Sequence, residues 1–210
     1  MTSKSENTLS KYLPEGSLDL TMQLLRTAPV ELKIKQPRKT KFGDYRFPKK
    51  NERHRISING NLNVYAFLIT LVHEMAHLKA FESFGNGIKP HGEEWQVTFR
   101  QLMTPYLEQN IFPKNLRSAL IKSLNRGSAS SCTDLELFRV LQAFDKKPAL
   151  VVEELETGTC FSLGNDMIFK KGPRARKRYR CLNLSNGRED MVHPLAEVKR
   201  IEPKNNIKSA

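Results

Sequence analysis

The sequence predicts an α+β protein built from two parts of different character. Residues 1–147 combine short strand patterns with long helical patterns, whereas residues 148–202 hold short runs rich in Val, Phe, Leu and Tyr between glycine-containing turns. A chain of 210 residues, 39% of them hydrophobic and 27% charged, is long enough for one full core and a small second module. We therefore expect a mixed domain over 1–147, a β-rich module over 148–202 and a flexible tail over 203–210.

The first elements are a helical pattern and two strand patterns. Residues 7–27 have the apolar spacing of an entry helix, in which Ser17 is a candidate N-cap. Residues 30–35 (VELKIK) and 55–59 (RISIN) alternate apolar and polar side chains, which is the period of a strand. The segment between them, 36–54, is basic and rich in turn residues, and we expect a turn there.

Helical patterns dominate the next eighty residues. A long helix is expected from Asn61 or Asn63, either of which can cap it, to about Phe84. The Gly-Asn-Gly sequence that follows suits a helix end, because glycine and asparagine tolerate the left-handed conformation found there. Three further helices are expected over 92–107, 113–125 and 133–145.

Three of the chain's five histidines lie within 19 residues of this helical region. His73 and His77 are four residues apart in the sequence HEMAH, so their imidazoles project from the same side of the helix and can bind one divalent ion. Glu74 follows the first histidine and can approach metal-bound water without being a ligand. This spacing predicts a hydrolytic metal site in which Glu74 is the general base.

His91 is the candidate third ligand. It begins the helix that returns after the glycine turn, and three protein ligands leave a fourth position open for water, as catalytic zinc requires. Glu93 or Glu94 could take this place instead. The alternative without metal is a core helix whose histidines are hydrogen-bonded along its polar edge. His54 and His193, which lie among basic or turn residues, are expected to be solvated.

The motifs HEMAH and PHGEEW, with its HGxxW core, together resemble the SprT-like (Spartan-type) zinc metalloproteases. The resemblance implies a zincin-like domain with His73, His77 and His91 as ligands of one Zn²⁺ and Glu74 as catalytic base. Upstream, LKIKQPRKTKFGDYRF and ISIN resemble the family's strand, R-x-x-x-x-G-x-Y turn and second strand, so the likeness covers about residues 20–110. It implies cleavage of proteins bound or crosslinked to DNA.

The chain departs from the family pattern in the C-terminal module. Where a zinc ribbon has two CxxC knuckles, the sequence has Cys160-Phe-Ser-Leu and Cys181-Leu-Asn-Leu. Two thiolates alone do not make a structural zinc site, so we expect a degenerate ribbon held together by apolar packing. Cys132 lies apart from both, and three widely spaced cysteines fit a reducing compartment.

The net charge of +13 favours a polyanionic partner, for which nucleic acid is the first candidate. Ten Lys or Arg residues and two acids lie within 33–55, and seven Lys or Arg residues and no acid lie within 170–180. We expect sequence-independent contacts to DNA phosphates from the following residues: Arg38, Lys39, Lys41, Lys170, Lys171, Arg174, Arg176, Lys177, Arg178 and Arg180. A solvated charged face is the alternative for each run.

The N-terminal residues and the longest apolar run indicate where in the cell the protein is found. Residues 1–16 lack the apolar block of a secretory signal, and the longest apolar run, 64–72, is too short to cross a bilayer. We expect a cytoplasmic protein without membrane contact, with the nucleoid as a second location consistent with DNA binding.

Two other function classes compete with a protease. One is a nucleic-acid-binding protein whose metal site is structural or inactive. The other is a metal-dependent nuclease, which the presence of only six Asp residues disfavours because such sites commonly use carboxylate-bridged metals.

Overall fold

The computed structural model describes residues 3–38, 41–48, 52–127, 134–164 and 167–201. The chain is a mixed α and β protein with two separate sheets, and it divides into two compact units, Met1–Lys146 and Lys147–Ala210. None of the helices in the described ranges has both the length and the apolarity that a membrane span needs.

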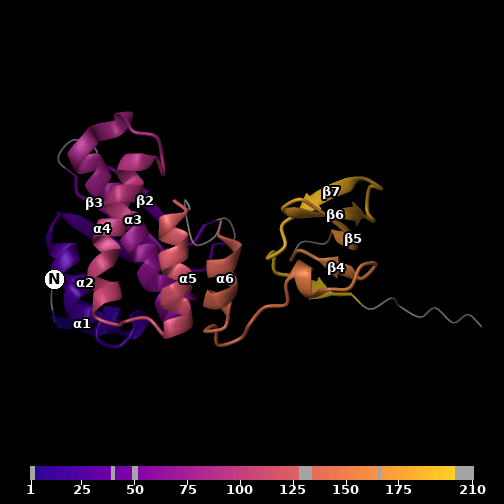
Figure 1. Ribbon diagram of the computed structural model, residues 1–210, viewed down its shortest axis with the longest axis horizontal. Coiled ribbons are helices and arrows are strands. Elements are labelled where there is room, and N and C mark those ends of the chain that lie inside the picture. The colour runs from indigo at the N-terminus through magenta and orange to yellow at the C-terminus, as the bar shows by residue number, and fades with distance from the viewer. Residues whose placement is uncertain (1–2, 39–40, 49–51, 128–133, 165–166, 202–210) are drawn as a thin grey trace, which may run out of the picture. The chain divides into compact units, whose positions relative to one another are not determined.

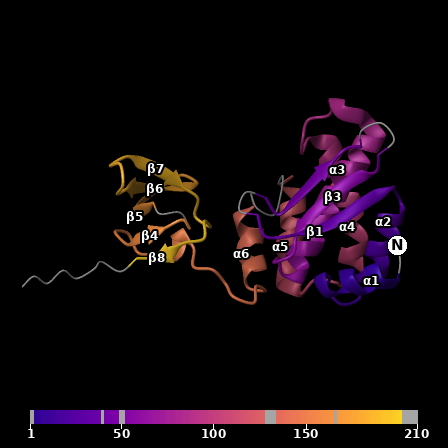
Figure 2. The ribbon, with the colours of Figure 1, turned by 180° about the vertical axis from the view of Figure 1, so that it is seen from behind.

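The sheet of the first unit has three strands in the order β1-β3-β2. Strand β1 (Val30–Lys35) runs parallel to β3 (His54–Asn59), and β2 (Gly43–Arg46) lies antiparallel on the other side of β3. In the view of Figure 2, β1 and β3 lie in front of the helices. One face therefore packs on the core through buried Ile56 and Ile58, and the other face is open.

The two predicted strands are confirmed, and the basic segment with turn residues over 36–54 contains a further strand, β2, which the sequence pattern did not predict. Residues Gly43–Arg46 pair with Ile58–Arg55 of β3, so long-range pairing overrides the turn-forming residues around them.

The central helix α3 (Val64–Phe84) begins and ends as its sequence predicts. The Asn63 side chain accepts a hydrogen bond from the Ala66 N–H, and its amide also donates to the Leu141 carbonyl and to Asp145. At the other end Gly85 has a φ of 73°, a conformation that glycine adopts without strain, and the short helix η2 (Gly85–Gly87) follows. Figure 1 shows α3 in the middle of the unit.

The helices after α3 follow the predicted ranges closely. They are α4 (Glu93–Glu108), α5 (Lys114–Asn125) and α6 (Leu135–Gln142). The core between them and α3 contains fully buried side chains such as Phe67, Trp95, Met103 and Leu116.

The entry helix expected over residues 7–27 is wrong as a single element. It consists of α1 (Ser3–Leu9), the short helix η1 (Ser10–Tyr12) and α2 (Leu18–Arg26). Pro14 and Gly16, whose φ is 77°, interrupt it. Ser17 does precede α2, but its hydroxyl donates to the Pro14 carbonyl at 2.7 Å instead of accepting a hydrogen bond from the helix.

The loop before β2 is fastened to β3 by a reciprocal pair of side chains. Arg38 Nε donates to Asn59 Oδ1 at 2.8 Å, and its other guanidinium nitrogens donate to the hydroxyl and carbonyl of Ser57. Asn59 is 2% exposed and donates in return to the carbonyls of Arg38 and Lys41. These bonds hold Arg38 and the Lys41 carbonyl against β3, on either side of the loop that leads to β2.

The second unit contains a five-stranded antiparallel sheet in the order β7-β6-β5-β4-β8. The helix η3 (Val152–Glu154) precedes the strands, which are β4 (Cys160–Ser162), β5 (Ile168–Ala175), β6 (Arg178–Asn183), β7 (Glu189–Val192) and β8 (Lys199–Arg200). Phe161 and Phe169 stack in its core at 5.7 Å between ring centroids, beside buried Val152 and Cys181.

Replacing Asn59 by Ala should destabilise the first unit strongly. The change removes three hydrogen bonds and leaves the half-buried Nε donor of Arg38 and two carbonyls without that partner, so we expect a loss of about 2–4 kcal/mol in the free energy of unfolding. Urea unfolding measures the loss. Asn61→Ala, at an exposed position two residues away, is the control. Equal, small effects of the two variants would show that the hydrogen bonds between Arg38 and Asn59, here called the Arg38–Asn59 clasp, contribute little to stability.

Candidate metal centre

The imidazoles of the three predicted metal ligands, His73, His77 and His91, point towards one another. His73 and His77 extend from α3, and His91 extends from the loop before α4. Their Nε2 atoms lie 3.2 Å (His73–His77), 3.0 Å (His77–His91) and 3.2 Å (His91–His73) apart. His91 has a φ of 58°, a strained conformation for a residue with a side chain, and such strain often accompanies functional sites.

The three Nε2 atoms cannot all be satisfied by hydrogen bonds to one another. The Nε2 atom of a neutral imidazole is either a donor or an acceptor, so among three of them at least one pair is two donors or two acceptors. A cation that accepts all three lone pairs removes this conflict. In the described ranges, the ligand atoms of His73, His77 and His91 form the one group of His, Cys, Asp or Glu side chains arranged closely enough to hold a metal ion.

The three histidines are kept neutral by their surroundings. Burial lowers the pKa of His73 well below its usual value, and the neighbouring histidines lower it further. Burial, with His91 beside it, lowers the pKa of His77 to about 4, and burial also lowers that of His91. All three lone pairs are therefore available to a metal ion at neutral pH. Glu93 and Glu94, the alternative third ligands, are not part of this group.

Trp95 lies against the whole triad. Its ring centroid is 4.7 Å from that of His73, 5.3 Å from that of His77 and 4.7 Å from that of His91. Phe99 stacks on its other side at 5.0 Å. Trp95 is 1% exposed, so this side of the site is closed to water and the imidazoles are held in place. Its buried indole N–H has no hydrogen-bond partner among the described residues.

Glu74 lies one residue from the first histidine and is enclosed by strand β2. It is 6% exposed, and the backbone N–H of Tyr45 donates a hydrogen bond to it. Burial raises the pKa of Glu74 to about 8, with a further contribution from the negative charge of Asp44. Gly43 is in direct contact: a Cβ atom there would lie 2.4 Å from Glu74 Oε1 and 2.7 Å from Thr70 Cγ2. Only glycine therefore fits beside this carboxyl group.

Tyr45 and His54 belong to the surroundings of the site and were missed by the sequence patterns. The Tyr45 ring lies parallel to that of His77, 6.4 Å away, and its hydroxyl is 2.9 Å from His54 Nδ1. His54 is 5% exposed, so the expectation that it is solvated is wrong. Its Nε2 faces Glu82 Oε1 at 3.7 Å. Alternation along β2 could have indicated Tyr45, because it places Tyr45 on the same face of the strand as Gly43, which contacts Glu74.

Two of the three basic residues predicted in the first unit to contact DNA have structural partners. The half-buried guanidinium of Arg38 is bonded to β3, as described above, and Lys41 pairs with Asp44 at 2.5 Å. Lys39 lies outside the described residues.

The basic hairpin β5–β6 carries exposed cations, with one exception. The exposed residues are Lys170, Arg174, Arg176, Lys177, Arg178 and Arg180. Lys171 is 5% exposed; its ammonium donates to the carbonyls of Glu153 and Leu155 and lies 4.2 Å from the centre of the Tyr179 ring. Because these contacts occupy Lys171 inside the unit and cover one face of Tyr179, Lys171 is not available for phosphate contact.

Two of the three cysteines, Cys160 and Cys181, lie in strands. Cys181 is buried in β6, where burial raises the pKa of its thiol, and Cys160 is half-buried at the start of β4. Cys132 lies outside the described residues.

The fold and the site define a class: a mixed α and β protein in which an HExxH helix and the loop that follows it bring together three histidines that could hold one metal ion. Residues 17–115 match the model of the SprT-like family, and we assign this region of the chain to that family.

The similarity to individual proteins is local. Protein SprT from Pseudomonas syringae pv. tomato is 61% identical over 31 residues, and Protein SprT from Pseudomonas fluorescens (strain Pf0-1) is 58% identical over 31 residues. Each match spans 15% of this chain and 19% of the relative. No solved structure matches the chain.

The pKa shifts predict how the stability of the metal-free protein varies with pH. Because the pKa values of the three histidines lie below 6.5 in the folded state, the unfolded chain binds more protons there, and stability falls as the pH drops from 6.5 towards 4. Glu74 acts in the opposite sense. Its pKa in the folded state, about 8, exceeds the usual value of 4.5, so its contribution to stability is lost as the pH rises towards 8.

Urea unfolding of chelator-treated protein should therefore show greatest stability between about pH 6.5 and 7. Glu74→Gln should remove the decline on the alkaline side and keep the decline on the acid side. A stability that rises steadily from pH 6 to pH 8 in the wild-type protein would contradict the assigned shift of Glu74.

Gly43→Ala tests the close packing of β2 against Glu74. The added methyl group must displace the carboxyl group or the strand, so we expect a loss of about 1–3 kcal/mol in the free energy of unfolding. Gly87→Ala is the matched control, because a Cβ atom at Gly87 meets nothing within 4 Å. Thermal unfolding of both variants measures the difference, and equal melting temperatures would refute the contact.

Proposed function

We propose that the protein is a zinc-dependent metalloendopeptidase of the SprT-like type. The observation that carries this proposal is the convergence of three histidine Nε2 atoms within 3.0–3.2 Å, with the buried carboxyl group of Glu74 one residue from the first. Membership of residues 17–115 in the SprT-like family supports it.

The donor set favours one Zn²⁺. Two nitrogens bound tetrahedrally to zinc at about 2.0–2.1 Å lie about 3.3 Å apart, close to the separations of the three Nε2 atoms. Three neutral imidazoles are a common ligand set of catalytic zinc, and they leave a fourth position for water or substrate. Zinc held by these residues would supply Lewis-acid chemistry: it would lower the pKa of water and polarise the carbonyl of a peptide bond.

Glu74 supplies the proton transfers. Its carboxylate takes a proton from the attacking water and later gives it to the departing amine. The pKa of about 8 belongs to the site without metal, and a divalent cation beside the carboxyl group favours its ionised form. The Tyr45 N–H and the close contact with Gly43 hold this carboxyl group in one position. A purely structural metal site, the alternative for a nucleic-acid-binding protein, has no use for such a base.

The proposed substrates are proteins bound or crosslinked to DNA. The net charge of +13 and the exposed cations of the β5–β6 hairpin support sequence-independent contact with DNA phosphates. The resemblance to SprT-like proteases supports the protein substrate. We expect this activity in the cytoplasm or on the nucleoid, without membrane contact.

Glu74→Gln tests the catalytic assignment. The variant should retain one zinc per chain, measured by elemental analysis, and lose degradation of a DNA-binding protein by about 10²–10⁴-fold. Glu108→Gln, an exposed glutamate on α4, is the control and should degrade the substrate like the wild type. The assay is run with and without DNA.

The outcomes separate the two function classes. Undiminished hydrolysis in Glu74→Gln would exclude Glu74 as the base. If the zinc-loaded wild type binds DNA but degrades no protein under any condition, the nucleic-acid-binding alternative replaces the protease.

A further inference from the structure

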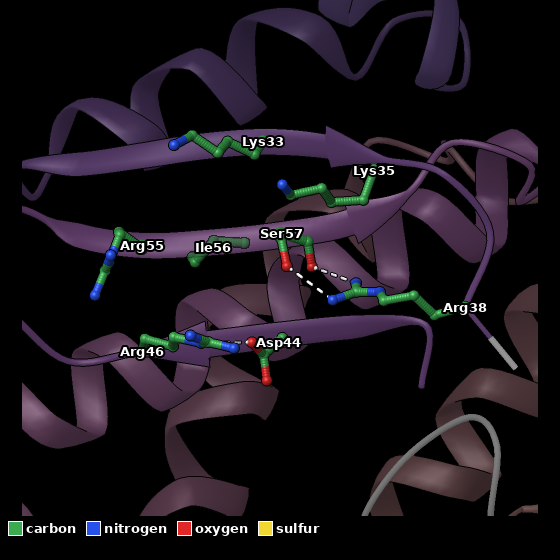
Figure 3. Close-up of a pocket in the computed structure, with 8 residues that line it drawn as sticks. All are labelled: Lys33, Lys35, Arg38, Asp44, Arg46, Arg55, Ile56 and Ser57. Carbon is green, nitrogen blue, oxygen red and sulfur yellow. Dashed lines mark hydrogen bonds and ion pairs between the residues drawn. The ribbon is translucent and has the colours of Figure 1, made fainter. Parts of the chain in front are cut away.

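The outer face of the three-stranded sheet gathers positive charge from four segments of the chain. Because side chains alternate along a strand, Lys33 and Lys35 of β1, Arg55 of β3 and Arg46 of β2 all point away from the core. Arg38 extends over the same face from the loop before β2, as Figure 3 shows. Together with Asp44, Ile56 and Ser57 these residues line a half-open hollow of about 210 Å³.

The charges in this hollow are only partly compensated. Five cations face one acid, Asp44, which already pairs with Lys41 and Arg46. Burial would raise the pKa of Asp44, but these two partners outweigh it and the pKa is lowered, so Asp44 is ionised. In the described part of the chain, Lys35 and Arg38 have no carboxylate partner: Arg38 bonds only to neutral groups.

The sheet also places like charges side by side. Arg46 and Arg55 are directly opposite in the register of β2 and β3, an arrangement that destabilises a sheet. The remaining compensation is weak, because Lys33 pairs with Glu31 at 2.9 Å and Arg55 with Glu52 at 3.6 Å, both in exposed positions. A bound anion would relieve the repulsion across this face.

We propose that this outer sheet face (Lys33, Lys35, Arg38, Arg46 and Arg55) binds the phosphodiester backbone of a nucleic acid strand. The cations are spread over three strands of an open surface, which suits a chain of phosphates rather than one enclosed anion. No aromatic side chain lines the hollow on which a base could stack, so the contact is with the backbone and is independent of sequence.

The inference rests on the proposed function and adds the place where the nucleic acid lies. On strand β2, Gly43 and Tyr45 point inward to Glu74 and His77, whereas Asp44 and Arg46 point outward to the hollow. The metal centre and the outer sheet face are therefore on opposite sides of one strand. A nucleic acid and a protein substrate can be bound at the same time, as cleavage of a DNA-bound protein requires.

The test is equilibrium binding of the full chain to a fluorescently labelled oligonucleotide, single-stranded and duplex, over a range of salt concentrations. The variant Lys33→Gln, Lys35→Gln and Arg55→Gln should bind at least about tenfold more weakly, and the slope of log affinity against log salt should fall by about 2. The control variant removes the same charge from three exposed positions elsewhere: Lys11→Gln, Lys114→Gln and Lys146→Gln. It should bind within about threefold of the wild type.

Asp44→Asn provides a test of opposite sign. Removing the one acid of the hollow frees Lys41 and Arg46, so affinity for the oligonucleotide should rise by about threefold or more. A loss of affinity would overturn the proposal. Because this variant is expected to gain binding, misfolding cannot imitate the predicted result.

Competition identifies the occupant. Unlabelled oligonucleotide should displace the labelled strand, whereas inorganic phosphate and poly-glutamate at equal charge concentration should not. If poly-glutamate competes equally well, the face is a site for acidic peptides and the proposal fails. It also fails if the triple variant and its control bind alike.

Failure of this inference is distinguishable from failure of the proposed function. Degradation of casein without DNA reports on the metal centre alone. The difference in oligonucleotide affinity between the triple variant and its control, both in metal-free form, reports on the outer sheet face, because the β5–β6 hairpin is unchanged in both. If the wild type degrades casein and the triple variant still binds DNA as tightly as the wild type, the outer sheet face is not the nucleic acid site, and the proposed protease activity stands.

Discussion

Three imidazole nitrogens that approach within 3.0–3.2 Å of one another cannot all be satisfied by hydrogen bonds, and this conflict is the constraint on which the site depends. The protein accepts an unfavourable arrangement: the histidines are partly buried, kept neutral and, in His91, held by a strained backbone. A metal ion bound there would turn this repulsion into coordination. The free energy of metal binding would then add to the stability of the fold.

Strand β2 links this centre to the rest of the first unit. Its inner side chains close the site around Glu74 and His77, and its outer side chains form one edge of a positively charged face. The strand is short and lies at the edge of the sheet, so its position depends on the clasp between Arg38 and Asn59. The same clasp holds the Arg38 guanidinium beside the outer hollow. The candidate metal site and the positively charged face thus share one small structural element.

The parts that the sequence predicted are those with local causes. The cap at Asn63, the glycine end of α3 and the co-facial pair His73 and His77 follow from spacing within a single helix. The missed parts depend on pairing between distant segments. Strand β2 forms because it pairs with β3, and His54 is buried because Tyr45 meets it across these strands. Lys171 looks like a surface cation in sequence, and its burial depends on carbonyl groups of residues 153 and 155.

X-ray absorption at the zinc edge of the protein purified under native conditions tests the central claim directly. The account predicts one zinc per chain, with nitrogen and oxygen neighbours at about 2.0–2.1 Å and scattering from three imidazole rings. His91→Ala should remove one ring from that signal. Sulfur neighbours at about 2.3 Å would place the metal on the cysteines instead, and this result, or a zinc environment unchanged in His91→Ala, would contradict the three-histidine centre.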